Sequence, residues 1–175
     1  MPTALLPTHD FREKPFPRVE DVATLSDPTI AAIFAYWERK RGTRRMPSRA
    51  DIDPVELRGL VNNIALYDVI EPQLFGETDP LYRVRLVGSD IVEFDGRNTT
   101  GEWIGTGKPP ELVAQITGML TSIVVSRAPR FRTGIVYWKR DRSYRRFQSC
   151  LLPLSPDGGA VNMILNAVSY VPHLA

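Results

Sequence analysis

The fold of this 175-residue chain is best anticipated from Arg44–Pro54, which reads RRMPSRADIDP. The segment carries three arginines and two aspartates, Asp51 and Asp53, which are separated by one residue. Asp53 stands directly before a proline and three residues before Glu56, which is the spacing of a capping box at a helix start. We therefore expect a short helix at about 54–60, following a break at Met46-Pro47, because the residue before a proline avoids helical geometry.

The same segment allows a chemical interpretation. Asp51 and Asp53 match the D-x-D spacing of a metal site in sugar-nucleotide transferases, but no neighbouring His or acid completes a coordination shell. We instead expect structural roles for Arg49, Asp51, Asp53 and Pro54. In this interpretation Arg49 pairs with a carboxylate, such as Asp51 or one on the sheet, and fixes the preceding helix to the domain.

Upstream of this segment, the chain divides into an arm and a helix. Residues 1–26 hold four of the fifteen prolines and show no sustained periodicity, so we expect an extended arm followed by a single domain over 27–175. Asp27 and Pro28 suit the start of a helix over about 28–41. Its apolar face, which includes Ile33, Phe34 and Trp37, packs either on the domain's own sheet or on a second copy of the chain.

Downstream, the apolar period shortens toward two. Five segments have the composition of β-strands, namely 63–70, 81–87, 130–138, 144–154 and 160–171. Within 81–87 a clean alternation places Tyr82, Val84 and Leu86 on one side. Between the second and third strands we expect a turn of helix ending near Phe94 and then a long amphipathic helix that starts at Pro109-Pro110 and ends before Pro129.

This order of elements resembles that of the PAS fold, and several strings sharpen the resemblance. Trp37–Arg41, Met46–Pro54, Tyr82–Ser89 and Gly96–Gly101 resemble a bacterial family of small stand-alone PAS-like proteins over roughly residues 27–170. The resemblance implies an α+β fold with a five-stranded antiparallel sheet in the order 2-1-5-4-3. Helices would cover one face of that sheet, with an additional helix at the N-terminus.

The resemblance also implies a function. PAS domains sense a small ligand held between sheet and helices, or associate with partners through flanking helices and the outer sheet face. We therefore expect a sensory or adaptor module of bacterial signalling that forms a homodimer or binds a signalling protein, since little chain remains for an output domain. The candidate cavity residues are Tyr67, Tyr82, Trp103, Ile116, Leu120, Tyr137 and Met163, and the candidate interaction residues are Ile33, Phe34, Trp37, Arg142, Arg145 and Arg146.

The composition narrows the cofactors and the location. The histidines, His9 and His173, lie near the termini, which disfavours haem with a histidine ligand. Cys150 is the single cysteine and falls on an expected strand, so cysteine-adduct flavin chemistry is also disfavoured, whereas a non-covalent flavin or another apolar ligand stays open. No apolar run is long enough to span a bilayer and no secretory leader is evident, so we expect a cytoplasmic protein that does not engage a membrane.

Two alternatives of other classes remain. Although the net charge is only +2, eight Lys or Arg residues and a single acid lie between Arg127 and Arg146, which predicts a basic surface able to bind anions or nucleic acid. A small α+β hydratase or isomerase, with a carboxylate such as Asp68 as its base, is the other alternative. The usual nucleophile, phosphate-loop and His-Glu metal motifs are absent from the sequence, so we do not expect an enzyme.

Overall fold

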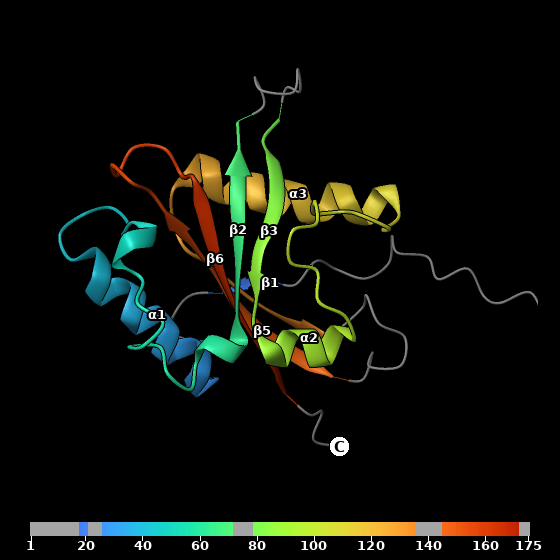
Figure 1. The fold of residues 1–175 in the computed structure, drawn as a ribbon, viewed down its shortest axis with the longest axis horizontal. Coiled ribbons are helices and arrows are strands. Elements are labelled where there is room, and N and C mark those ends of the chain that lie inside the picture. The colour runs from blue at the N-terminus through green and yellow to red at the C-terminus, as the bar shows by residue number, and fades with distance from the viewer. Residues whose placement is uncertain (1–17, 21–25, 72–78, 136–144, 172–175) are drawn as a thin grey trace, which may run out of the picture.

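The structure, a computed structural model, describes residues 18–20, 26–71, 79–135 and 145–171 (Figure 1). Its helices are α1 (Pro28–Arg41), α2 (Ser89–Asp95) and α3 (Pro110–Ser126), with single 3-10 turns at Arg49–Asp51 and Val61–Asn63. Its strands are β1 (Arg18–Glu20), β2 (Ile64–Ile70), β3 (Leu81–Val87), β4 (Arg130–Ile135), β5 (Arg146–Leu154) and β6 (Met163–Val171). Of the helices in these ranges, none combines the length and apolar character needed to cross a membrane.

The strands form one antiparallel sheet in the order β1-β4-β5-β6-β2-β3. Without β1, this is the expected five-stranded order 2-1-5-4-3, so the prediction of a PAS-like α+β fold is confirmed. The sheet has a sixth strand that the sequence did not suggest. Arg18–Glu20, in the segment expected to be an extended arm, pairs with β4 and extends that edge.

Helix α1 covers one face of the sheet (Figure 1). Asp27 caps its N-terminus by accepting from the backbone N–H groups of Thr29 and Ile30 at 2.9 and 3.1 Å. The indole of Trp37, with 1% of its surface exposed, donates to the carbonyl oxygen of Pro153 in β5 at 3.0 Å. The ring of Phe34 meets Phe131 of β4 edge to face, with centroids 4.9 Å apart. The apolar side of α1 is therefore packed on this chain's own sheet.

Helices α2 and α3 cover the opposite face (Figure 1). Phe94 of α2 stacks on Tyr170 of β6 with centroids 3.6 Å apart. The hydroxyl groups of Tyr82 on β3 and Thr121 on α3 lie 2.8 Å apart, within hydrogen-bond distance. Because side chains alternate along a strand, β5 and β6 present every second residue to α1 and the others to α2 and α3. Both central strands are consequently buried on both faces.

Two local expectations were wrong. The pairing of β2 with β3 shifts register between Leu66 and Tyr67, so Leu86 pairs with Leu66 and departs from the alternation begun by Tyr82 and Val84. Such an irregularity exchanges the two faces of a strand. In addition, residues 54–60 form successive turns, not the expected helix.

The start of α2 contains a close approach between backbones that only glycine permits. A Cβ atom built on Gly88 would lie 2.3 Å from the carbonyl oxygen of Asn62, and backbone atoms cannot yield as a flexible side chain can. We expect Gly88→Ala to lower the free energy of unfolding by about 2 kcal/mol or more, because the turn at Val61–Asn63 must move. Urea denaturation provides the measurement.

Gly118→Ala is the matched control for that substitution. Gly118 lies exposed in the interior of α3, and its added Cβ would meet nothing within 4 Å. This variant should gain about 0.5–1 kcal/mol, since alanine loses less backbone entropy than glycine on entering a helix. A Gly88→Ala protein as stable as the wild type would show that the approach of Gly88 to Asn62 is not a constraint.

Candidate functional site

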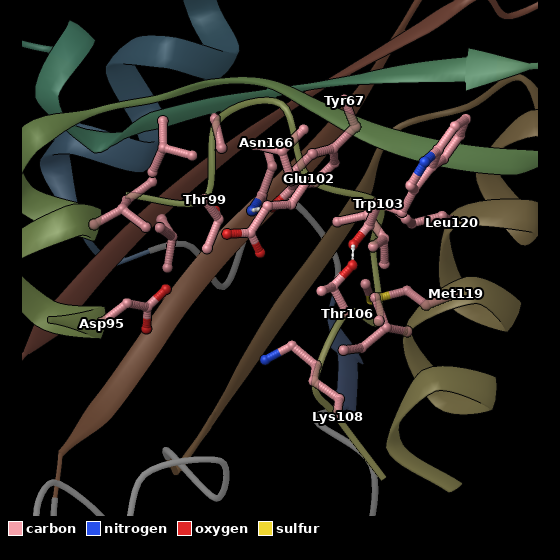
Figure 2. Close-up of a pocket in the computed structure, with 18 of the residues that line it drawn as sticks. Tyr67, Asp95, Thr99, Glu102, Trp103, Thr106, Lys108, Met119, Leu120 and Asn166 are labelled. Atoms are coloured by element: carbon pink, nitrogen blue, oxygen red, sulfur yellow. Dashed lines mark hydrogen bonds between the residues drawn. The ribbon is translucent and has the colours of Figure 1, made fainter. Parts of the chain in front are cut away.

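A pocket of about 190 Å³ lies between the sheet and the helices α2 and α3 (Figure 2). Its sheet side is formed by alternate residues of adjoining strands, including Ala65 and Tyr67 of β2, Leu151 of β5 and Asn166 of β6. These residues share a face because Ala65 pairs with Asn166, and Asn166 pairs with Leu151. The pocket is thus a direct product of sheet register.

The helices line the pocket with mostly apolar side chains, and the segment between them adds polar and charged ones at the rim. Ile91 of α2 and Leu112, Ile116 and Leu120 of α3 contribute, with Ile104 from the connecting segment. Aliphatic walls of this kind select a ligand by shape and leave its orientation to a small number of polar groups.

Tyr67 and Asn166 form a polar pair within the pocket. Asn166 Nδ2 donates to the Tyr67 hydroxyl oxygen at 3.0 Å, and the two side chains converge in the pocket in Figure 2. Burial raises the pKa of Tyr67 above its usual value, so the hydroxyl keeps its proton at neutral pH. The pair therefore presents a neutral phenol beside a carboxamide.

Arg132 of β4 brings a positive charge to the same pocket. Its Nε donates to the hydroxyl of Ser149 at 3.0 Å, and another guanidinium nitrogen contacts the sulfur of Met119. The guanidinium carbon also lies 5.3 Å from the ring centroid of Phe147, a cation–π arrangement. Arg132 is held by residues of the pocket side of the sheet and does not extend freely into solvent.

The mouth of the pocket is built on the edge of β3. The backbone of Val84 donates to Glu102 at 2.8 Å, and that of Ile104 donates to Tyr82 at 2.9 Å. These bonds hold Trp103, which is 42% exposed, at the rim. Arg97 and Glu102 form a bidentate ion pair across the rim with distances of 2.7 and 2.8 Å.

Four of the seven candidate cavity residues line the pocket. Tyr67, Trp103, Ile116 and Leu120 line the pocket, which places the four side chains around one space. Tyr82 faces the same side of the sheet but is buried with its hydroxyl beside that of Thr121, and it does not line the pocket. Met163 was wrongly assigned, because it pairs with Asp68 and faces the α1 side. Tyr137 lies outside the described residues.

Sequence reasoning missed Asn166 and Arg132, both of which line the pocket. A usable signal existed for Asn166, which is a carboxamide within the apolar run Met163–Val168. A polar residue at a buried strand position requires a partner, and it therefore marks a place where packing alone does not explain the sequence. Arg132 had been counted as part of an exposed basic surface.

The candidate interaction residues do not form one surface in the structure. Ile33 and Trp37 lie in the core beneath α1, and Phe34 packs against that core, so this apolar face is covered within the chain. Arg146 is exposed and Arg145 is half-buried, whereas Arg142 lies outside the described residues.

The expected single basic surface is not formed by the described arginines. Arg132 pairs in register with Ser149, so the two side chains share the pocket face of the sheet. Arg146 is three positions from Ser149 along β5, and side chains alternate between faces, so Arg146 faces the opposite side.

Asp68, the suggested catalytic base, lies on the face opposite the pocket, where it is bound by Arg85 at 2.6 Å and by Arg83 at 3.4 Å.

Cys150 lies on the α1 side of β5 and is fully buried. Burial raises the pKa of its thiol to about 12, so it is protonated at neutral pH. Its side chain points away from the pocket, because Leu151, the next residue, lines it. The thiol is therefore not positioned to react with a ligand held there.

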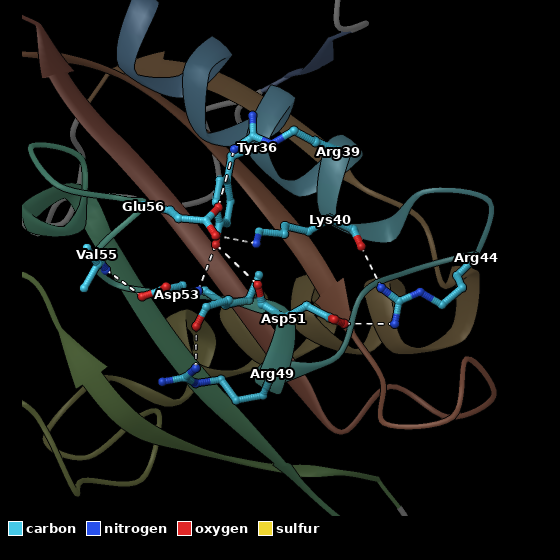
Figure 3. Close-up of polar contacts among 10 residues, drawn as sticks. Tyr36, Arg39, Lys40, Arg44, Arg49, Asp51, Asp53, Val55 and Glu56 are labelled. Carbon is cyan, nitrogen blue, oxygen red and sulfur yellow. Dashed lines mark hydrogen bonds and ion pairs between the residues drawn. The ribbon is translucent and has the colours of Figure 1, made fainter.

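The segment Arg44–Pro54 forms a clasp between α1 and the sheet (Figure 3). Its capping box joins Ser48 to Asp51, not Asp53 to Glu56. Asp51 Oδ2 accepts from the backbone N–H of Ser48 at 2.7 Å and from Arg44 at 2.9 Å. The expected pairing of Arg49 with Asp51 was wrong, because Arg49 donates to the carbonyl oxygen of Ile52 at 2.9 Å.

The second half of this clasp is held by α1. The hydroxyl of Tyr36 accepts from the backbone N–H of Asp53 at 2.8 Å, and Asp53 Oδ1 accepts from the N–H of Val55 at 2.8 Å (Figure 3). Glu56 pairs with Lys40 at 2.7 Å.

Across the described ranges, no group of three His, Cys, Asp or Glu side chains could hold a metal ion, which removes the support for a D-x-D metal site.

The strand order and the helices on opposite faces of the sheet, with a pocket beneath α2 and α3, define a PAS-like α+β fold. A PAS domain family model matches residues 25–169, and the chain belongs to this family. The family places it among sensory signalling modules in general. Among solved structures, the chain is similar to the PAS domain of BvgS from Bordetella pertussis, with 18% identity, a TM-score of 0.49, and coverage of 71% of this chain and 89% of that chain. No curated protein sequence matches it.

The clasp predicts a pH-dependent contribution from Asp51. The bond from Arg44, assisted by Ser48, lowers the pKa of this carboxyl from 3.8 to about 2. A depressed folded-state pKa means that the ionised carboxylate stabilises the fold above about pH 4, and that this stabilisation is lost as the pH falls toward 2. We expect Asp51→Asn to lower the free energy of unfolding by about 1–2 kcal/mol at pH 7.

Denaturation of the wild type and Asp51→Asn at several pH values measures this effect. The difference between the two proteins should shrink between about pH 4 and pH 2. Arg49→Ala, which removes one bond to a backbone carbonyl, serves as the control and should show a difference of about 1 kcal/mol or less without change in that window. A pH-independent difference for Asp51→Asn would refute the role assigned to its charge.

Proposed function

We propose that this chain is a sensory PAS module that binds a small molecule in the pocket between the sheet and the helices α2 and α3. The observation that carries the proposal is the pocket itself, a space of about 190 Å³ with aliphatic walls in which Tyr67 and Asn166 form a hydrogen-bonded polar pair. Charged side chains, among them Asp95, Lys108 and Arg132, also line it. Apolar walls with a few converging polar groups are typical of sites for small ligands. A side-chain-filled interior would favour a purely adaptor role.

The volume limits the size of the ligand. An apolar cavity of about 150 Å³ is large enough to bind benzene, so a pocket of about 190 Å³ suits one ring with a small substituent. The described lining residues include neither His nor Cys, which fits an organic ligand held without a covalent bond better than a histidine-ligated haem or a cysteine adduct. We therefore propose that the part of the ligand held inside the pocket is no larger than a substituted benzene.

The sheet offers a route from the pocket to α1. Asp27, which caps α1, accepts from the Ser169 hydroxyl at 2.6 Å, and its backbone N–H donates to Gln148 at 2.9 Å. The neighbours of these two residues along β5 and β6 are Ser149, which binds Arg132, and Tyr170, which lines the pocket. A ligand that shifts either strand would therefore also shift the start of α1.

Output from α1 would pass through self-association, as a homodimer, or through a signalling partner protein. The buried apolar side of α1 is not offered to such a partner, so the contact would use its polar side or another surface. Sedimentation velocity over a range of protein concentrations tests self-association. A single monomeric species at every concentration would leave a partner protein as the proposed route.

Benzene is a suitable probe of the pocket, and amide NMR spectra report its position. Ile116→Phe should weaken benzene binding by at least about tenfold, because the added ring occupies the space that the ligand needs. Val125→Phe is the matched control on the same helix, where the native side chain is 75% exposed, and it should bind as the wild type does. Leu112→Phe fills the pocket from the preceding turn and provides a second test.

Saturable shifts in residues around the pocket, abolished by the two filling substitutions, would support a ligand site. Wild-type protein that shows no benzene binding, together with no small molecule in native mass spectra of freshly purified protein, would contradict the sensory part of the proposal. Equal weakening by Val125→Phe would show that benzene binds elsewhere on α3.

A further inference from the structure

We infer that the pocket selects a small compound whose apolar ring carries an acceptor oxygen, a carbonyl or a carboxylate, and that Tyr67 and Asn166 bind this oxygen. The inference rests on the proposed function, since it names the chemical class of the pocket's ligand. It follows from the hydrogen-bonding capacity that the two side chains leave unused and from the charge beside them.

Tyr67 has a proton to donate. Its hydroxyl oxygen already accepts from Asn166 Nδ2, so the hydroxyl hydrogen must point in another direction. Within the described part of the chain no acceptor receives it, and the surroundings keep the phenol protonated. Because Tyr67 lines the pocket, an oxygen of a bound compound is the natural acceptor.

Asn166 carries a similar excess of capacity. One hydrogen of its amide reaches Tyr67, and the second is left for another acceptor. Its Oδ1 is buried without a hydrogen-bond donor among the residues that the structure describes. Reversing the amide would satisfy Oδ1 from Tyr67 but would place the NH₂ group in the same buried position, so neither orientation is satisfied by Tyr67 alone. A buried polar group left in this state costs free energy that a ligand can recover.

The charges around the pair favour an electron-rich ligand group. The guanidinium of Arg132 is close enough to the Tyr67 hydroxyl to oppose the rise in its pKa, while Asp95 acts in the opposite direction. Lys108 also lines the pocket, and Arg97 is neutralised by Glu102. Donors from Tyr67 and Asn166 beside a guanidinium suit an acceptor oxygen, and the presence of Asp95 allows a neutral carbonyl as well as a carboxylate.

Three probes with the same ring, namely toluene, benzamide and benzoate, separate the contribution of the acceptor oxygen from that of its charge. We expect benzamide and benzoate to bind about fivefold to tenfold more tightly than toluene in NMR titrations, the ratio that one net hydrogen bond supplies. A preference for benzoate over benzamide would assign the larger share to Arg132, and equal binding would assign it to Tyr67 and Asn166. Both results support an acceptor-oxygen site.

Tyr67→Phe should abolish the preference for the oxygen-bearing probes over toluene, measured as the ratio of their dissociation constants in the same titrations. Tyr82→Phe is the matched control, because Tyr82 lies on the same sheet face but its hydroxyl lies beside that of Thr121 and does not line the pocket. Asn166→Leu, which keeps a similar volume, tests the carboxamide separately. It also provides a second measurement if Tyr67→Phe is unstable.

The outcomes distinguish this inference from the proposed function. If benzene and toluene bind in the pocket but the oxygen-bearing probes bind no more tightly, the sensory pocket stands and the acceptor-oxygen site is wrong. A preference that survives both Tyr67→Phe and Asn166→Leu would also overturn the assignment to this pair. If none of the probes binds to the wild type, the inference and the proposed function fail together.

Discussion

Burial of β5 and β6 on both faces is the constraint on which the rest of the structure depends. Leu151, Leu152, Ile164 and Leu165 are fully buried, and successive residues point to opposite sides of the sheet. One face alone cannot bury them all. The chain meets this requirement with α1 on one side and with α2 and α3 on the other (Figure 1). Helix α1 is therefore part of the core and not an appended segment.

This two-sided arrangement also gives the pocket its position. On the α1 side, Trp37 and Phe34 fill the space against the sheet. On the other side a pocket remains between the sheet and the helices, and Asn166 interrupts the apolar run Met163–Val168. A buried carboxamide destabilises the fold unless its donor and acceptor groups find hydrogen-bond partners. The ligand site that we propose would supply such a partner.

The clasp formed by Arg44–Pro54 shows how a helix-capping motif can be ambiguous in the sequence. Both Ser48-to-Asp51 and Asp53-to-Glu56 have the spacing of a capping box, and the sequence offers no local reason to prefer either. The choice depends on basic residues of α1 and of the segment that follows it. Arg44 reaches Asp51, while Lys40 draws Glu56 away from the backbone. A capping motif near a helix of opposite charge is thus decided by tertiary contacts.

The sequence by itself determined the three main helices, five of the six strands and their order, but neither the strand Arg18–Glu20 nor the turns at 54–60. The apolar period of three to four in α1 and α3, the β-forming composition of the strands and the turn residues between them depend on a few neighbours along the chain, so they can be recognised without the fold. The resemblance of this order to the PAS fold implied the sheet order 2-1-5-4-3, which the structure confirms for the five expected strands.

Only the tertiary structure decided which face each side chain occupies. Met163 and Asn166 are three residues apart on one strand and therefore face opposite sides, but only the pairing with β2 determines which of them reaches the pocket. Arg132 enters the pocket rather than an exposed basic surface for the same reason. A register shift of one residue exchanges all such assignments, and register is set by packing across the sheet, which a single strand does not encode.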